Sequence, residues 1–313
     1  MRTLVIGDLN VDIIASGIDG LPILGHEIFC RDIRTLMGGS ASIFACRLAQ
    51  LGAEVDIMGK VGRDHHGRIV LENLRSSGVG LGRVMNEDDI RTGVTISLTY
   101  PENKALITFP GSIDSLEEKD INPDVFNNYN HLHISSIYIQ RRLLPSIPKI
   151  LKEAKSRGLI TSLDTQADPL NRYEYIWEIL DHVDIFLPND VEAKRITGSE
   201  DLAEALDRLS LKVGVVVIKC GERGAIGKSD GRVVKVKPIR IKPIDTTGAG
   251  DSFDAGFIYY YLHRGMGFEE SVRFANALGA LSCLYIGGAD RKINELEVLK
   301  FLKNHQPEVV NKG

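Results

Sequence analysis

The sequence has little cysteine for its length, with four in 313 residues and no Cys-x-x-Cys spacing. A chain of this size buries enough apolar surface to fold without disulfide bonds, so Cys30, Cys46, Cys220 and Cys283 are expected to be buried, reduced thiols. This scarcity argues against a small disulfide-linked secreted scaffold. It predicts a protein of a reducing compartment, the cytoplasm.

Three further features are missing. With 38 basic and 42 acidic residues the net charge is −4, and no basic stripe with stacking aromatics points to nucleic acid. The apolar runs are far shorter than a membrane span. A strand is predicted from residue 3, and Asp8 follows before a signal-peptide core has room to form. We therefore expect a soluble cytoplasmic protein with no nucleic-acid or membrane partner.

The most informative segment is Asp-Thr-Thr-Gly-Ala-Gly-Asp at residues 245–251, followed by a mostly apolar stretch, 252–262, that predicts a buried helix. The glycines permit a tight turn, and the backbone amides of 248–251 would be unpaired donors at the positive end of the helix dipole. A carboxylate at Asp251 would repel an anion bound there, unless it takes a proton from a hydroxyl attacking a phosphate. The arrangement indicates phosphoryl transfer.

The same residues have other possible interpretations. Taken alone, the heptapeptide is equally typical of a glycine-rich helix start capped by an acidic residue. It is not a dinucleotide fingerprint, because Phe253 stands where the third glycine should be. The segment 221–229 has one residue too many for a Walker A loop.

Two separated motifs carry a family resemblance. The heptapeptide at 245–251 and the pair Gly38-Gly39, which leads into 45–52, resemble the signatures of the ribokinase-like (PfkB) carbohydrate kinases. The resemblance runs from Gly7 to about Gly288. It implies a ribokinase-like α/β fold and an ATP-dependent kinase that transfers the γ-phosphate to a hydroxyl of a sugar or sugar-like molecule.

The resemblance also assigns residues by position. Asp251 would be the catalytic base, with an anion hole formed by Gly248, Ala249 and Gly250. The acceptor would be bound by Asn10, Asp12, Gly38 and Gly39. The nucleotide would be bound by Asn189, Lys219, Gly221, Gly224 and Asn276. Glu192 would bind Mg²⁺ through water, and Asp245 and Thr247 match a possible K⁺ site.

Some of these residues have ordinary structural explanations as well. Asn189 and Glu192 have the spacing of a helix capping box, which is compatible with a role at the metal. Asn10 and Asp12 would also suit a solvated strand end, and Asn276 a half-exposed helix position. His131 and His133 alternate on a predicted strand without a third ligand nearby, which favours a hydrogen-bonded structural pair over a metal site.

Strand and helix patterns alternate through the chain and predict one doubly wound, mainly parallel α/β domain over 1–313. Helices are predicted at 40–51 and 64–77, and strands at 55–58, 131–135, 160–164, 183–187 and 213–218, followed by a hairpin over 225–237. Short alternating stretches within about 13–36 and 91–110, the second with a turn at 101–104, predict a small β lid. A lid would exclude water, and in relatives it packs on a second subunit, so a homodimer is expected.

The acceptor is the least determined ligand. Relatives that bind ribose or fructose carry Asn where this chain has Ile43, and the segment 164–168 lacks an Arg expected for a ketodeoxygluconate carboxylate. No convincing pair of basic residues is placed for a sugar phosphate, although Arg91 and Arg141 are candidates. A neutral hexose, an inositol or a nucleoside remains, so a nucleoside or inositol kinase is the alternative. A non-catalytic sugar- or nucleotide-binding regulator stays open, whereas the missing fingerprint argues against a dehydrogenase.

Overall fold

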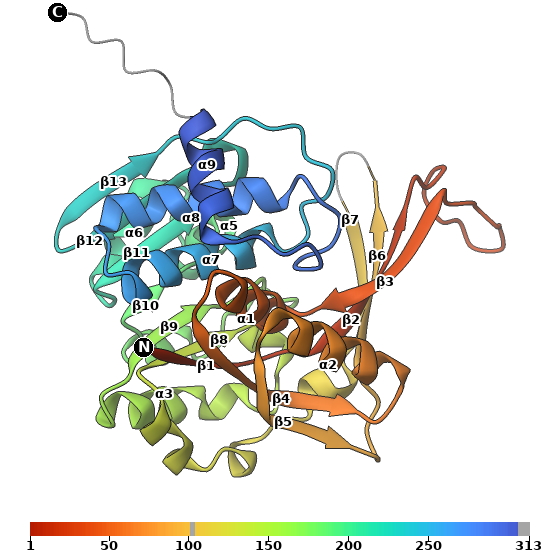
Figure 1. The fold of residues 1–313 in the computed structure, drawn as a ribbon, viewed down its shortest axis with the longest axis horizontal. Helices are drawn as coiled ribbons and strands as arrows, with labels where there is room; N and C mark the ends of the chain where they lie inside the picture. The colour runs from red at the N-terminus through yellow and green to blue at the C-terminus, as the bar shows by residue number, and fades with distance from the viewer. Residues whose placement is uncertain (101–103, 306–313) are drawn as a thin grey trace, which may run out of the picture.

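The larger of two β-sheets forms the centre of the molecule in the computed structural model, which describes residues 1–100 and 104–305 (Figure 1). Its strand order within these residues is β13-β12-β11-β10-β9-β8-β1-β4-β5. The strands are β1 (Arg2–Ile6), β4 (Glu54–Gly62), β5 (Gly80–Glu87), β8 (His131–Ser135), β9 (Ile160–Asp164), β10 (Ile185–Phe186), β11 (Val215–Lys219), β12 (Ala225–Ser229) and β13 (Arg232–Val236). All neighbours from β11 to β5 are parallel, and β12 and β13 form an antiparallel hairpin at one edge. The predicted mainly parallel sheet and its terminal hairpin are confirmed.

Helices cover both faces of this sheet, each over its own apolar core. One face packs against α1 (Ser40–Gln50), α2 (His65–Ser77), α7 (Ala249–Ile258), α8 (Phe268–Ser282) and α9 (Glu295–His305). The other packs against α3 (Ile147–Ser156), α4 (Ile176–Leu180), α5 (Asp190–Thr197) and α6 (Leu202–Ser210). Successive residues of β1 divide between the cores: Val5 joins the first, and Leu4 and Ile6 join the second. This division explains why the strand reads as a continuous apolar run.

The smaller sheet has the order β3-β2-β6-β7 and projects from one side of the molecule (Figure 1). Its strands are β2 (Asn10–Ser16), β3 (Asp32–Gly38), β6 (Gly93–Thr99) and β7 (Lys104–Phe109). They fall in the two stretches where a lid was predicted, although β2 begins three residues earlier than the expected boundary at 13. The turn predicted at 101–104 lies mostly outside the described residues.

The apolar run at the start of the chain suggested that Asn10 and Asp12 lie at the end of the first strand. The structure places them elsewhere. β1 ends at Ile6, and both polar residues belong to β2 in the small sheet. The chain leaves the large sheet at Asp8, whose carboxylate accepts hydrogen bonds from the amides of Ser40 and Ala41, each at 3.0 Å. Asp8 thus caps α1 at the point where the chain passes from the large sheet to the small one.

A row of polar side chains crosses the buried face of the large sheet beneath α1. His131 and His133 both hydrogen-bond the Ser162 hydroxyl, at 2.8 and 2.7 Å. The row continues from His131 to Thr3 and from His133 to Ser135. Burial lowers the pKa of His131 to about 3 and that of His133 well below its ordinary value, so both rings are neutral. The histidines are a structural pair, as predicted, bridged through Ser162.

Two further expectations concern thiols and membranes. Cys46, Cys220 and Cys283 are buried free thiols, whereas Cys30 is a free thiol on the surface, which corrects the expectation that all are buried. Within residues 1–100 and 104–305, no helix is both long and apolar enough to cross a membrane.

Replacing Ser162 by alanine is expected to destabilise the fold by about 2–4 kcal/mol, because it leaves two buried imidazole nitrogens without partners. Urea denaturation followed by circular dichroism would measure this loss. Ser156→Ala is the matched control, since Ser156 is exposed and bonds only a carbonyl of its own helix. Equal stability of the two variants would contradict the inferred importance of the polar row.

Candidate active site

The N-terminus of α7 forms the centre of the candidate site. Gly248 precedes the helix with φ 70°, and a Cβ there would lie 2.7 Å from the Gly288 Cα and 3.0 Å from the Ile43 side chain. The Ala249 amide donates a long hydrogen bond, 3.3 Å, to the Thr246 carbonyl. The amides of Gly250 and Asp251 follow in the first turn, where the helix itself offers no acceptor. Of the predicted hole of Gly248, Ala249 and Gly250, Ala249 thus has a partner of its own, and the Asp251 amide is a further donor beside Gly250.

Asp251 lies in this first turn with its side chain buried. Its Oδ1 accepts hydrogen bonds from the Ser40 hydroxyl at 2.5 Å and from the side-chain amide of Gln166 at 3.2 Å. Burial, and then the charge of Asp164, raise its pKa to about 7. A carboxylate with this pKa can accept a proton near neutral pH and still be partly ionised beforehand.

The pair Gly38-Gly39 packs against the side chains of Asn10 and Asp12. A Cβ at Gly38 would lie 2.1 Å from the Asp12 Oδ1, and one at Gly39, where φ is 88°, would lie 2.8 Å from the Asn10 Oδ1. Asn10 donates to Asp12 at 3.0 Å. The glycines therefore make room for these two side chains. Burial, and then the charge of Asp8, raise the pKa of Asp12 to about 6.

A cluster of charged side chains lies behind Asp251. The ammonium of Lys219 donates to Asp254 at 2.7 Å and to Asp164 at 3.1 Å. Burial raises the pKa of Asp254 well above its ordinary value. Burial lowers the pKa of Lys219, but the charges of Asp164, Asp254 and Glu192 together raise it above its usual range. The structure thus turns Lys219, predicted to bind nucleotide, toward buried carboxylates.

Asn189 and Glu192 form the capping box that their spacing predicts. The Glu192 amide donates to Asn189 Oδ1 at 2.9 Å, and the Glu192 carboxylate accepts from the Asn189 amide and side chain at 2.9 and 2.6 Å. Burial, and then the charge of Asp164, raise the pKa of Glu192 to about 7. A parallel bridge from Asn189 to Lys219 places this box beside the cluster.

The other predicted nucleotide residues lie around the turn after β11. Gly221 (φ 54°) and Gly224 (φ 86°) frame the turn, and a Cβ at Gly224 would lie 2.1 Å from the Val236 carbonyl. The half-buried Asn276 of α8 donates to the Lys237 carbonyl at 3.1 Å. These three residues form one side of the site, along the hairpin and α8.

Asp245 joins two loops. Its Oδ1 accepts from the Thr247 amide and its Oδ2 accepts from the Gly287 amide, both at 2.9 Å. The two residues predicted for a monovalent cation are therefore adjacent to the backbone of 286–288. Within the described part of the chain, no group of three or more His, Cys, Asp or Glu side chains has the geometry of a metal site.

The residues considered for acceptor specificity have other partners. Arg141 donates to Asp114 from two nitrogens, at 2.9 and 2.6 Å. Arg91 lies 4.5 Å from the ring centroid of Phe109. Ile43 is buried and its side chain lies against Gly248 and Gly288.

Five residues of the site were missed by the sequence analysis: Asp8, Ser40, Gln166, Asp164 and Asp254. Asp164 ends a strand at the carboxyl edge of the sheet and Gln166 follows it by two residues, a position typical of ligand-binding residues. Asp254 was detectable as a lone acid, three residues after Asp251 in an apolar helix. Ser40 and Asp8 carried no comparable signal.

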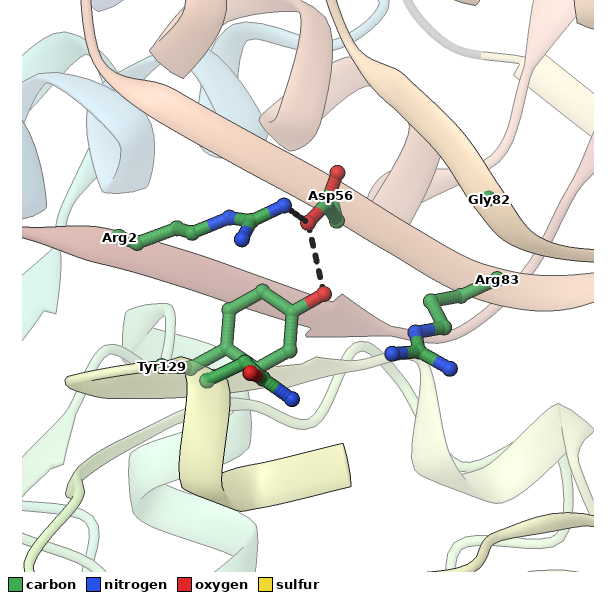
Figure 2. A pocket seen from close by; sticks show the side chains of 6 residues that line it. Arg2, Asp56, Gly82, Arg83 and Tyr129 are labelled. Atoms are coloured by element: carbon green, nitrogen blue, oxygen red, sulfur yellow. Dashed lines mark hydrogen bonds and ion pairs between the residues drawn. The ribbon is translucent and has the colours of Figure 1, made fainter. Parts of the chain in front are cut away.

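A separate cavity of about 400 Å³ opens at the amino ends of β1 and β4 (Figure 2). It is lined by Arg2, Asp56, Gly82, Arg83, Asn128 and Tyr129. The Arg2 guanidinium and the Tyr129 hydroxyl both donate to Asp56 Oδ2, each at 2.6 Å. None of the predicted site residues lines this cavity.

An open α/β sheet with unpaired amides at a helix N-terminus and a buried carboxylate among them is suited to phosphoryl transfer. Comparison with known proteins agrees. The profile of the pfkB family carbohydrate kinases matches residues 2–294. An uncharacterised sugar kinase of Archaeoglobus fulgidus is 34% identical over 245 residues, covering 77% of this chain and 96% of its own. The ribokinase of Bacillus subtilis is 28% identical, covering 94% and 98%.

A solved structure of an E. coli protein, provisionally assigned as ribokinase II and in complex with ATP and Mg²⁺, superposes with a TM-score of 0.87. It covers 97% of this chain and 99% of its own at 22% identity, which shows the shared fold. The chain belongs to the pfkB family of carbohydrate kinases. It is an ATP-dependent sugar kinase of that family, a phosphotransferase with an alcohol group as acceptor.

Gly38→Ala is expected to push the Asp12 carboxylate out of position, because the new methyl group would occupy the same space. The Michaelis constant for the sugar should rise about tenfold or more, as when a buried hydrogen-bond partner is lost, and that for ATP should change little. Steady-state kinetics would measure both. Gly82→Ala is the control, because a Cβ there meets nothing within 4 Å. An unchanged Michaelis constant for the sugar in Gly38→Ala would contradict this steric argument.

Proposed function

We propose that the chain transfers the γ-phosphate of ATP to a hydroxyl of a neutral sugar or sugar-like molecule, with Asp251 as the base. One observation carries the proposal: Gly38, Gly39 and Ser40 join the acceptor residues to the base. Gly38 contacts Asp12, Gly39 contacts Asn10, and Ser40 donates to Asp251. Three consecutive residues thus link the polyol-binding side chains to a carboxylate beside open amides.

Asn10 and Asp12 would hold adjacent hydroxyls of the acceptor. Their mutual hydrogen bond leaves one carboxylate oxygen of Asp12 and the Asn10 Oδ1 as acceptors for two hydroxyl groups. Holding the acceptor here orients one hydroxyl toward Asp251 and converts an encounter into a positioned reaction.

Asp251 takes the proton of that hydroxyl as the oxygen bonds to phosphorus. The bond from the γ-phosphorus to the bridging oxygen breaks, and ADP leaves with the electron pair. The amides of Gly250 and Asp251 donate to the transferring group as negative charge shifts across it. Gln166 and Ser40 keep the carboxylate of Asp251 oriented throughout.

The nucleotide would lie along Asn189, Gly221, Gly224 and Asn276, which surround the turn after β11 and its hairpin. Glu192 suits Mg²⁺ held through water, because Mg²⁺ bound with ATP keeps several waters and needs one or two carboxylates. Glu192 is buried close to the charge of Asp164, so a cation bound there would offset the repulsion between the two acids. The ion would neutralise charge on the phosphates when bound.

Asp245 and Thr247 could hold K⁺ together with carbonyls of 286–288. ATP as donor and three buried thiols support a cytoplasmic protein.

A neutral acceptor is supported by the surroundings of the two arginines considered for a phosphorylated sugar. Arg141 is neutralised by Asp114, and Arg91 stacks on Phe109. Ile43, in place of an amide, removes a hydrogen-bonding group beside Gly248. A hexose, a cyclitol or a nucleoside is therefore expected to be a better acceptor than ribose.

ADP release from MgATP across ribose, fructose, myo-inositol, adenosine and cytidine tests the function and the acceptor together. We expect turnover with at least one acceptor, and a higher kcat/KM for one of the last four than for ribose. Ribose as the best substrate would refute the interpretation of Ile43. Tight binding without turnover on any of them would favour a regulator.

Asp251→Asn is expected to lower kcat by about 10²–10⁴-fold while ATP binding stays nearly intact, because a base is lost without a change of shape. In the unchanged enzyme kcat should rise as pH increases through about 7, where Asp251 loses its proton. Asp207→Asn, at an exposed residue that pairs with Lys228, is the control. Near-normal turnover in Asp251→Asn would exclude this residue as the base.

We also propose a homodimer formed through the small sheet. Strand register places Ile13, Ile96 and Ile107 in one row, and Ala15 and Ile33 in the next, on the face opposite Asp12. Ile33, Ile96 and Ile107 are 63%, 38% and 61% exposed in the single chain. An apolar row of this kind suits burial against a second copy.

Ile107→Glu is expected to convert the dimer to a 34.5-kDa monomer, because the charge would be buried without a partner in the interface. Light scattering coupled to size exclusion would measure the mass. Leu211→Glu, at a site 86% exposed outside the small sheet, should leave it unchanged. A monomeric parent protein at micromolar concentration would contradict the proposed dimer.

A further inference from the structure

The ammonium of Lys219 points into the protein at the end of β11. It donates to Asp254 and Asp164, whose side chains are each 1% exposed, and its own side chain is 11% exposed. Asp254 Oδ1 has no hydrogen-bond partner in the described part of the chain. Lys219 therefore provides the main compensation for two carboxylates that have almost no contact with water.

An unbroken line of hydrogen bonds leads from this lysine to the proposed base. Lys219 donates to Asp164 Oδ2 at 3.1 Å, and the side-chain amide of Gln166 donates to the same oxygen at 3.1 Å. The same amide group donates to Asp251 Oδ1 at 3.2 Å and to the Ser40 hydroxyl at 3.2 Å. Gln166 adopts a left-handed backbone with φ 55°, unusual for its type, which brings its side chain between the two acids.

We propose that Lys219 is a positioning residue for phosphoryl transfer: held by Asp254, it fixes Asp164, and through Gln166 it fixes the orientation and charge of Asp251. This inference rests on the proposed role of Asp251 as the base. Lys219 acts through its neighbours and is not assigned a contact with either substrate. Asp254 serves the same task by anchoring the ammonium.

The physical need for a cation here follows from the surrounding charges. Asp251 is faced by Asp164 from β9 and by Asp8, which follows β1, with Lys219 from β11 as the compensating cation. Asp254 of the same helix and Glu192 of α5 add their charges around Asp164 and Lys219. Like charges at close range and low dielectric disfavour ionisation, and a protonated Asp251 cannot act as a base. Lys219 opposes that effect.

Direct phosphate binding is the competing role for this lysine, and the site does bring it close to the anion-binding turn. A Cβ on Gly250 would lie 3.7 Å from the ammonium nitrogen. Two charge-assisted hydrogen bonds already occupy the ammonium on the opposite side, toward Asp164 and Asp254. Removing Lys219 should therefore alter the base more than the affinity for ATP.

The test measures Asp251 directly in the full-length protein, by ¹³C NMR titration of labelled aspartate carboxyls, with the signal assigned by its absence in Asp251→Asn. Lys219→Met should raise the Asp251 pKa by about one unit, because an opposite charge nearby is lost. The acid limb of the kcat profile should move up with it. The Michaelis constant for ATP should stay within about threefold of the parent value, as expected without a phosphate contact.

Asp254→Asn provides an independent sign test if Lys219→Met fails to fold. It removes one negative charge from the cluster at almost constant shape, so the Asp251 pKa should fall rather than rise. Lys228→Met, which breaks only the surface pair with Asp207, should change neither the titration nor kcat. Opposite shifts in the two cluster variants support the proposal, because a merely structural lysine would give a loss of stability without them.

Three results would overturn it. The first is an unchanged Asp251 pKa in both variants, and the second is a shift of that pKa in the same direction in both. The third is a large rise in the Michaelis constant for ATP in Lys219→Met with no change in the Asp251 titration. Failure of the proposed base is a separate outcome, since Asp251→Asn would then keep its turnover whatever the titrations show. The NMR measurement does not depend on activity, so the two failures are distinguishable.

Discussion

The bond between the Asp8 carboxylate and the first amides of α1 is the constraint on which the site depends. Asp8 follows the strand β1 of the large sheet, and Ser40 and Ala41 follow β3, an edge strand of the small sheet. The interaction therefore ties the two sheets together at one point. A carboxylate at a helix N-terminus interacts favourably with the helix dipole, by up to about 2 kcal/mol when partly buried. Because Gly39 has no side chain to cap the helix, Asp8 supplies that cap from another element.

Ser40 extends this constraint to the chemistry. Its amide is bound by Asp8 and its hydroxyl by Asp251, so one residue fixes the distance between α1 and α7. Burial, and then the charge of Asp164, raise the pKa of both Asp251 and Glu192 to about 7. The site reaches near-neutral proton affinity by burying carboxylates close to one another, without any histidine.

The sequence was sufficient for features written in local patterns. Period-two and apolar runs identified most strands, the glycine-rich heptapeptide identified the start of α7, and the spacing of Asn189 and Glu192 identified their capping box. It was insufficient where a role depends on contacts between distant segments. Asp8 caps a helix 32 residues later, and Gln166 bonds a carboxylate 85 residues away. The orientation of Lys219 was missed because nothing local shows that Asp164 and Asp254 meet it.

The alternation along β2 has an evolutionary consequence. Asn10 and Asp12, proposed to bind the acceptor, lie on one face of the strand, while Val11, Ile13 and Ala15 belong to the opposite, apolar face. Inserting or deleting one residue would exchange the two sets, placing hydrocarbon at the catalytic centre and acid on the outside. The length of this strand can therefore drift only in steps of two. Insertions and deletions among homologous sequences are therefore expected in the connection at 17–31, where an added residue changes neither face of the small sheet.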